Sequence, residues 1–405
     1  MDRIDLARQL GVRRPGPARG ETVISAADPR IFMARFASAT AARGTVFVAD
    51  PSWRAAQRET FAALLKSKTV NRESRIDRGW LCLPTGGTTG GMRLARHDQD
   101  TLSAAVSGCR RHFGAARISA IGVLPLHHVS GLMAWLRCAL TGGRYVAWSW
   151  DDLAAGRWPE VGGGDWFLSL VPTQLQRLLA RRSSADRLRR FRAVLLGGGP
   201  AWPELLERAA RLRLPLAPGY GMTETAAMVT ALRPEEFLAG RTGCGSALPH
   251  ARVTVEAGGV IRVASRSLFR GYYPDWRGAG TWPTADLGRL DEHGSLHVLG
   301  RRDAIIITGG EKVDPVAVEA ALLATGQFID VVVVGVPDVR WGHAVVACYP
   351  AGSRAPNLEA VERALARSLA GHERPKRFVA LGRWPRTASG KLSRPALAAI
   401  VAAQR

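Results

Sequence analysis

The sequence predicts an α/β fold in two domains, residues 1–299 and 300–405, and three observations support this prediction. Between about residues 45 and 220, short apolar runs alternate with amphipathic stretches, as in βαβ units of a mainly parallel sheet with helices on both faces. Residues 238–299 change to a two-residue alternation around Gly-rich turns, which indicates a small β-rich subdomain. From residue 300 on, strand-like and helix-like segments resume over a length typical of an α+β domain.

Each predicted element follows from its own apolar pattern. In the first part, strands are expected at 45–50, 80–83, 118–126, 144–148, 165–172 and 191–198, and helices at 58–66, 131–140, 173–182 and 202–212. A hairpin is expected at 251–265 and a further strand at 294–300. In the C-terminal part, strands are expected at 304–310, 331–337, 343–350 and 377–381, and helices at 315–324, 358–370 and from Arg394 on.

The charge balance and the cysteines narrow the class of protein. Fifty-six Lys and Arg residues against 34 Asp and Glu give a net charge of +22, but the basic residues are scattered and form no nucleic-acid-binding motif. We therefore expect no nucleic-acid partner. No apolar run approaches the ~18 residues that span a bilayer, and the N-terminus lacks the apolar segment of a secretory signal. Five scattered cysteines without a CxxC pair argue against disulfides and zinc and favour a cytoplasmic location.

A Gly/Thr-rich segment is the strongest local signal. It follows the apolar run at 80–83 and contains Thr85, Gly86, Gly87, Thr88, Thr89, Gly90 and Arg93. Glycines let backbone N–H groups converge on an anion, and the threonines and the arginine add donors suited to phosphate. The segment alone is equally compatible with an ordinary loop, and it is not a Walker loop. Three more segments, PLHHVSG, LLGGGP and PGYGMTE, also follow predicted strands, where ligands of α/β sheets gather.

Five ordered motifs resemble those of the acyl-adenylating superfamily, which includes acyl- and aryl-CoA ligases, luciferases and the adenylation domains of peptide synthetases. They are TGGTTGGMR (85–93), YGMTE (220–224), TAD (284–286), GRRDAIIITGGEKVDPVAVE (300–319) and PRTASGK (385–391). The resemblance implies a mobile C-terminal domain and an AMP-forming reaction with ATP, Mg²⁺ and coenzyme A. In this reaction a carboxylate attacks ATP to give an acyl-adenylate, and a thiol then displaces AMP.

The resemblance also implies the site residues. Catalytic roles fall to Lys391, Thr88 and Glu224, with Glu224 as the metal ligand, Gly309 and Gly310 at coenzyme A, His128 and Gly221 at the acyl substrate, and Asp303 as the hinge. ATP binding is implied for Thr85, Gly86, Gly87, Thr88, Thr89, Gly90, Arg93, Gly198, Gly199, Pro200, Tyr220, Gly221, Met222, Thr223, Glu224, Asp286, Arg301 and Lys391. Without the motif context, Lys391 reads as a solvated loop lysine, Glu224 as a helix cap, Asp286 as a turn residue, and His127 and His128 as structural histidines.

Within the superfamily, LPTGGTTG, SLVPTQLQRLL and IITGGEKVDP resemble the o-succinylbenzoate–CoA ligases of menaquinone and phylloquinone synthesis. Two alternatives stay open: another aryl- or acyl-CoA ligase, and a non-catalytic nucleotide-binding member. The chain departs from the family pattern at Met92, Arg93 and Ala285, where Pro, Lys and Gly are usual. Its phosphate loop also begins early, at residue 85, so a shortened N-terminal subdomain is expected. A homodimer is left open.

Overall fold

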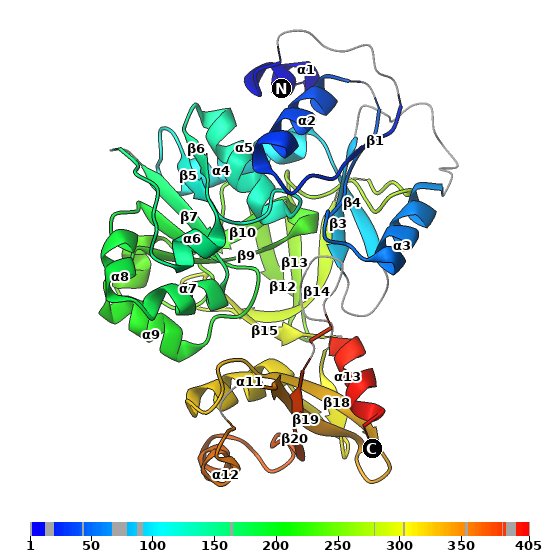
Figure 1. Ribbon diagram of the computed structural model, residues 1–405, viewed down its shortest axis with the longest axis vertical. Coiled ribbons are helices and arrows are strands. Elements are labelled where there is room, and N and C mark those ends of the chain that lie inside the picture. Colours follow the sequence, from blue (N-terminus) through cyan, green and yellow to red (C-terminus); the bar gives the residue numbers. More distant parts are fainter. Residues whose placement is uncertain are drawn as a thin grey trace.

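Three β-sheets and the helices that cover them form the N-terminal part of the chain, and a smaller unit lies beneath them (Figure 1). The computed structural model describes residues 2–12, 20–42, 44–66, 79–86, 92–162, 165–278, 280–302, 304–352, 355–382, 384–385 and 394–404. No helix in these ranges combines the length and the apolar character needed to cross a membrane. All five cysteines are free.

A seven-stranded sheet is the centre of the N-terminal part. Its order is β11-β10-β9-β8-β7-β5-β6; the five strands from β9 to β6 run parallel, and β10 and β11 are antiparallel. The strands are β5 (Ser119–Gly122), β6 (Tyr145–Ala147), β7 (Trp166–Leu170), β8 (Ala193–Leu196), β9 (Leu216–Met222), β10 (Ala227–Ala231) and β11 (Ser246–Ala247). The mainly parallel sheet predicted from the apolar runs is therefore present.

Helices cover both faces of this sheet, which explains why its strands are apolar throughout. Along β7, Leu168 and Leu170 face one core, while Phe167 faces a second core on the opposite side. The first core is closed by α6 (Trp150–Ala154), α7 (Pro172–Leu179), α8 (Arg182–Leu188), α9 (Pro203–Arg211) and α10 (Pro234–Leu238). The second is closed by α4 (Gln99–His112) and α5 (Val129–Thr141).

The other faces of α4 and α5 pack on a four-stranded sheet near the N-terminus. Its strands are β1 (Thr22–Ile24), β2 (Val46–Val48), β3 (Leu81–Gly86) and β4 (Met92–His97), and α1 (Arg3–Gln9), α2 (Pro29–Ala41) and α3 (Ala55–Lys66) accompany them. The first three strands run parallel, and β4 returns antiparallel to β3. Phe36 and Trp135 meet edge to face between the layers, with ring centroids 5.5 Å apart. The two large sheets are thereby held around one pair of helices.

The β-rich segment forms a third, antiparallel sheet. It comprises β12 (Ala251–Val255), β13 (Val260–Ser265), β14 (Thr281–Leu290) and β15 (Leu296–Arg301) in sequence order. Its apolar face, with Val263 and Leu296, packs against Tyr220 of the seven-stranded sheet and Ala95 of the first sheet. All three sheets of the N-terminal part therefore meet around Tyr220.

The C-terminal part has apolar cores of its own. It contains β16 (Ile306–Thr308), β17 (Glu311–Val313), α11 (Pro315–Ala324), β18 (Val332–Asp338), β19 (Gly342–Pro350), α12 (Leu358–Ser368), β20 (Arg377–Leu381) and α13 (Arg394–Ala402). Val333 and Val345 face α11 and α12, and Val334 and Val346 face α13. Figure 1 shows this unit below β15, joined to the rest through the chain after Arg301. The predicted hinge, Asp303, lies outside the described residues.

Candidate active site

The segment from Tyr220 to Glu224 lies at the meeting point of the three sheets. β9 continues through Met222, whereas the sequence analysis placed the whole motif after a strand. The extension depends on glycine: β10 pairs with β9 opposite Gly221, and a Cβ there would clash with the carbonyl oxygen of Ala227. The chain then makes the single 3₁₀ turn η1 (Thr223–Thr225). Glu224 therefore caps no long helix.

The side chain of Glu224 is buried between the motif and the Gly/Thr segment. It is 6% exposed, and its Oε1 accepts hydrogen bonds from the Tyr272 hydroxyl at 2.6 Å and from the Thr85 hydroxyl at 3.3 Å. The guanidinium carbon of Arg93 lies 4.3 Å from the centre of the Tyr272 ring. Burial raises the pKa of Tyr272, and the charge of Glu224 raises it further, so the phenol keeps its proton and donates it. A carboxylate and a guanidinium thus flank the first residue of the Gly/Thr segment.

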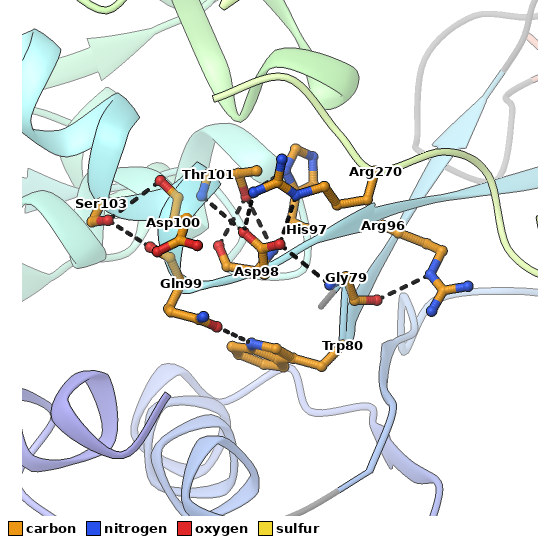
Figure 2. Close-up of polar contacts among 10 residues, drawn as sticks. All are labelled: Gly79, Trp80, Arg96, His97, Asp98, Gln99, Asp100, Thr101, Ser103 and Arg270. Carbon is orange, nitrogen blue, oxygen red and sulfur yellow. Dashed lines mark hydrogen bonds and ion pairs between the residues drawn. The ribbon is translucent and has the colours of Figure 1, made fainter. Parts of the chain in front are cut away.

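A buried polar network supports this turn from below. His97 Nε2 lies 2.7 Å from the carbonyl oxygen of Thr223 and must donate to it, because a carbonyl only accepts. Burial lowers the pKa of His97 to about 4, which keeps the ring neutral near pH 7. Asp98, the next residue, caps α4 through the N–H of Thr101 and receives Arg270 through two hydrogen bonds of 2.6 and 3.1 Å (Figure 2). Arg270 is two residues from Tyr272, so the same network fixes the tyrosine.

A second row of polar groups crosses from β9 to the third sheet. The Tyr220 hydroxyl donates a hydrogen bond of 2.6 Å to Asp286 Oδ2. Asp286 lies opposite Arg301 in the β14–β15 pairing, and its Oδ1 is 3.6 Å from Arg301 Nη1, which is an ion-pair distance. Burial raises the pKa of Tyr220, followed by the charge of Asp286. The row offers carboxylate and phenol oxygens beside an aromatic face.

The two polar rows bring together six of the predicted residues that the structure describes. Thr85, Glu224, Tyr220, Asp286 and Arg301 make the contacts above, and Arg93 joins them through Tyr272. Five predicted ATP-site residues, Gly87, Thr88, Thr89, Gly90 and Lys391, lie outside the described residues. Carboxylate oxygens, hydroxyls and guanidinium groups of this set suit a ligand that carries hydroxyls at one end and phosphates at the other.

Three further groups of predicted residues lie in turns and connecting segments. Gly198, Gly199 and Pro200 directly follow β8, and Gly198 has a φ of 80°. Gly309 and Gly310 form the turn between β16 and β17, where the Gly309 N–H donates to the carbonyl oxygen of Trp341 at 2.8 Å. His128 is the residue before α5 and is partly buried. The segment that contains Gly198, Gly199 and Pro200 lies at the carboxyl end of a parallel strand, where ligands bind in open α/β sheets.

Sequence reasoning missed several residues that shape the site. Tyr272, Arg270 and His97 carry no spacing pattern, because their contacts join segments far apart in the chain. Arg137 could have been noticed as an arginine inside the apolar helix GLMAWLRCAL. It is only 4% exposed, and its Nε has no hydrogen-bond partner in the part of the chain that the structure describes. A buried guanidinium without an acidic partner is costly unless an anion compensates it.

Comparison with known proteins decides the family. The sequence profile of the AMP-binding enzyme matches residues 15–273, and that of the AMP-binding enzyme C-terminal domain matches residues 317–391. The chain belongs to the AMP-binding enzyme family. The α/β fold and the resemblance to acyl-adenylating enzymes expected from the motifs are thereby confirmed.

The relatives of this chain within the AMP-binding family include 2-succinylbenzoate–CoA ligases. The chain is 31% identical over 340 residues to the 2-succinylbenzoate–CoA ligase of Listeria monocytogenes serotype 4b, covering 82% of this chain and 71% of that protein. Two structures of the Bacillus subtilis o-succinylbenzoate coenzyme A synthetase are similar, each 24% identical. One, with the acyl-adenylate intermediate, has a TM-score of 0.79 over 98% of this chain and 91% of that chain. The other, with ATP and a magnesium ion, has a TM-score of 0.76 over 97% and 92%.

Proposed function

We propose that this AMP-binding enzyme is an acid–CoA ligase that activates o-succinylbenzoate with ATP and transfers the acyl group to coenzyme A. The observation that carries the proposal is the convergence of Glu224, Thr85, Tyr220, Asp286 and Arg301 at the meeting point of the three sheets. The 2-succinylbenzoate–CoA ligase relatives supply the substrate. Retention of Lys391 together with Glu224, Asp286 and Arg301 argues against a non-catalytic nucleotide-binding member.

The two polar rows divide the recognition of ATP between them. Asp286 and Arg301 are placed to hold ribose hydroxyls, and Tyr220 presents its ring to the adenine while its hydroxyl orients Asp286. Arg93, with the backbone N–H groups and hydroxyls of the Gly/Thr segment, receives the phosphates. Lys391 supplies the charge that bridges the attacking carboxylate and the nucleotide. Fixed donors at the phosphates matter because negative charge develops there during transfer.

The residues present fit a magnesium ion. Glu224 is a buried carboxylate whose neighbours are hydroxyl groups, Thr85 Oγ1 and the Tyr272 phenol, and oxygen donors of this kind are what Mg²⁺ prefers. Glu224 would hold the ion, together with phosphate oxygens of the nucleotide. When bound, the ion offsets the negative charge of the phosphates.

The second carboxylate of o-succinylbenzoate needs a counter-charge, and Arg137 is placed to supply it. Arg137 lies on α5, which begins directly after His128 and packs against β10, the strand after the Glu224 turn. Its Nε has no hydrogen-bond partner in the described ranges. His250, whose two ring nitrogens also lack partners there, has a pKa lowered to about 4 by burial and by the charge of Arg137. A neutral imidazole beside a guanidinium can bind a carboxylate without a second positive charge.

Coenzyme A enters in the second half of the reaction. Gly309 and Gly310 have positive φ values of 58° and 85° and leave an open turn between β16 and β17. We place the thiol tunnel along this turn after rotation of the C-terminal unit about Asp303. A hinge of this kind absorbs a large backbone change in few residues.

A carboxylate panel tests the proposal. Pyrophosphate release is measured with ATP, Mg²⁺ and, in turn, o-succinylbenzoate, benzoates and fatty acids, and the thioester is identified by mass spectrometry. We expect o-succinylbenzoate to give the highest kcat/KM. Preference for another acid would assign the chain to a different acid–CoA ligase, and no release with any acid would support a non-catalytic member.

A further inference from the structure

The side chains of Asp50, His127 and His128 form a cluster. None of the three is among the ATP ligands proposed above. Asp50 follows β2 by two residues, and the two histidines lie between β5 and α5. One ligand atom from each of the three side chains lies within 4.8 Å of the others. The imidazole rings are adjacent, with centroids 4.5 Å apart and an interplanar angle of 57°. Three ligating side chains from two separate segments therefore converge on one point.

The spacing of two of these groups fits ligands around a common cation. His127 Nε2 lies 3.5 Å from Asp50 Oδ1, which is long for a hydrogen bond between nitrogen and oxygen. Two atoms bound to one metal at ~2.0–2.2 Å with tetrahedral angles are separated by about 3.3–3.6 Å. The distance in the protein matches this separation. The third ligand would complete the set through a small rotation of the His128 ring.

The carboxylate is already fixed in place. The backbone N–H and the hydroxyl of Ser52 donate to Asp50 Oδ1 at 2.8 and 2.6 Å. Oδ1 is also the oxygen that lies 3.5 Å from His127 Nε2, so these two donors fix the atom proposed as the ligand. Hydrogen bonds to a ligating carboxylate orient it and strengthen metal binding.

We propose that Asp50, His127 and His128 form a binding site for a divalent cation of the zinc class. Two imidazole nitrogens and one carboxylate oxygen suit Zn²⁺, Co²⁺ or Ni²⁺, whereas Mg²⁺ prefers oxygen ligands alone. The cysteine pattern argues only against thiolate zinc sites, and this donor set contains no sulfur.

The proposed cation site lies at the end of β2, near the start of the Gly/Thr segment. β2 and β3 run parallel with Phe47 opposite Cys82. Three residues further along each strand direction, Asp50, which follows β2, and Thr85, which is still within β3, therefore lie toward the same end of the sheet. A cation held by Asp50 lies beside the start of the Gly/Thr segment while using none of the proposed ATP ligands. Its fourth coordination position is left for water or an anionic group.

Cobalt binding tests the site without reference to activity. Metal-depleted protein is titrated with Co²⁺ in the presence of saturating Mg²⁺, following the visible absorption, and bound metal is counted by mass spectrometry. We expect one equivalent for the parent protein and for His293→Gln, a control at an exposed histidine. His127→Phe and Asp50→Asn should each weaken binding by at least about 10–100-fold.

Thermal unfolding with and without Zn²⁺ separates loss of the site from loss of the fold. The metal should raise the Tm of the parent and of His293→Gln, and leave that of the two site variants unchanged. Asp50→Asn keeps the shape of the side chain, so it remains informative if His127→Phe folds poorly. Equal cobalt binding by parent and both site variants, no binding by the parent, or displacement of Co²⁺ by Mg²⁺ would each overturn the proposal.

Discussion

Tyr272 joins the carboxylate and the guanidinium of the candidate site: its hydroxyl donates 2.6 Å to Glu224 Oε1, and its ring lies 4.3 Å from the guanidinium of Arg93. The two contacts use different parts of one side chain. The hydroxyl orients the proposed metal ligand, and the ring positions the charge at the end of the Gly/Thr segment. Substitutions can therefore separate the two effects.

Tyr272→Phe removes the hydroxyl and keeps the ring. A hydrogen bond to a charged group contributes about 1.5–3 kcal/mol, so we expect adenylation at low Mg²⁺ to fall by at least about tenfold. Higher Mg²⁺ should restore part of the rate, because only the orientation of Glu224 is lost. Tyr272→Leu, which also removes the ring beneath Arg93, should in addition raise the KM for ATP. Pyrophosphate release across a magnesium titration measures both effects; a rate unaffected by Tyr272→Phe would contradict the role of the hydroxyl.

Asp286→Asn should act on nucleotide binding more than on chemistry. The neutral amide of the asparagine cannot form the ion pair with Arg301. Its NH₂ group is a donor, as is the Tyr220 hydroxyl, so these two groups cannot replace the hydrogen bond that Asp286 accepts. We expect the KM for ATP to rise about tenfold or more with a smaller change in kcat, since the ribose is remote from the reacting phosphate. Tyr220→Phe provides the matched comparison, because it frees Asp286 from its hydroxyl partner and keeps the ring. A fall in kcat alone would place Asp286 at the reacting groups instead.

Lys391→Ala tests the catalytic lysine that the motif PRTASGK implies. Removal of one donor to developing charge lowers the rate by about 10²–10³, and we expect at least this loss in adenylation. A supplied acyl-adenylate should still be converted to the thioester, because that half-reaction does not use the lysine. Pyrophosphate formation at the parent rate would show that another residue provides the charge.

Arg394→Met should destabilise the C-terminal unit in a pH-dependent manner. Arg394 donates two hydrogen bonds, of 2.9 and 2.7 Å, to Glu319, and removal of one partner from a buried pair costs about 3–5 kcal/mol. Burial raises the pKa of Glu319 to about 7, although the charge of Arg394 lowers it. The carboxyl is therefore protonated well below pH 7 and charged above it. In the variant the charged form is unpaired, so the loss of unfolding free energy should grow as the pH rises from about 5 to 8.

Denaturant unfolding at several pH values measures this effect. The double variant Glu319→Gln/Arg394→Met serves as the control, since its amide cannot ionise. Because the double variant has no ionising carboxyl at position 319, its unfolding free energy should fall less than that of Arg394→Met as the pH rises from 5 to 8. A penalty in Arg394→Met that is independent of pH would show that the arginine acts through packing rather than charge.

Helices and strands that have a regular apolar pattern could be predicted from the sequence. The helices at 315–324 and from Arg394 on, and the alternation of strands and helices before residue 220, follow from apolar periodicity and agree with the structure. The path of β9 through Met222 could not be predicted, because it depends on the close approach of β10 at Gly221. The contact of Tyr272 with Glu224 joins residues 48 positions apart, and no local pattern records such a pairing.

Arg137 allows the choice of substrate to be tested by combining a variant with an analogue. The compound 4-phenyl-4-oxobutyrate keeps the ketone and the reacting carboxylate of o-succinylbenzoate but lacks the ring carboxylate. A site that pairs this carboxylate rejects the analogue, because its own buried polar groups then remain unpaired at about 1–3 kcal/mol each. We therefore expect the parent protein to show at least about a tenfold lower kcat/KM for the analogue than for o-succinylbenzoate.

Arg137→Met should remove this preference. The substitution removes the charge and retains an unbranched side chain in the buried helix, so kcat/KM for o-succinylbenzoate should fall while that for the analogue stays nearly constant. If Arg137 acted only through packing, both substrates would lose activity by the same factor, because each occupies the same pocket. The kcat/KM of the parent and of Arg137→Met, each measured with both compounds, gives four values. The interaction term calculated from these values isolates the contact between the guanidinium and the ring carboxylate. A term near zero would assign the second carboxylate to another group, and equal use of both compounds by the parent would remove o-succinylbenzoate as the preferred acid.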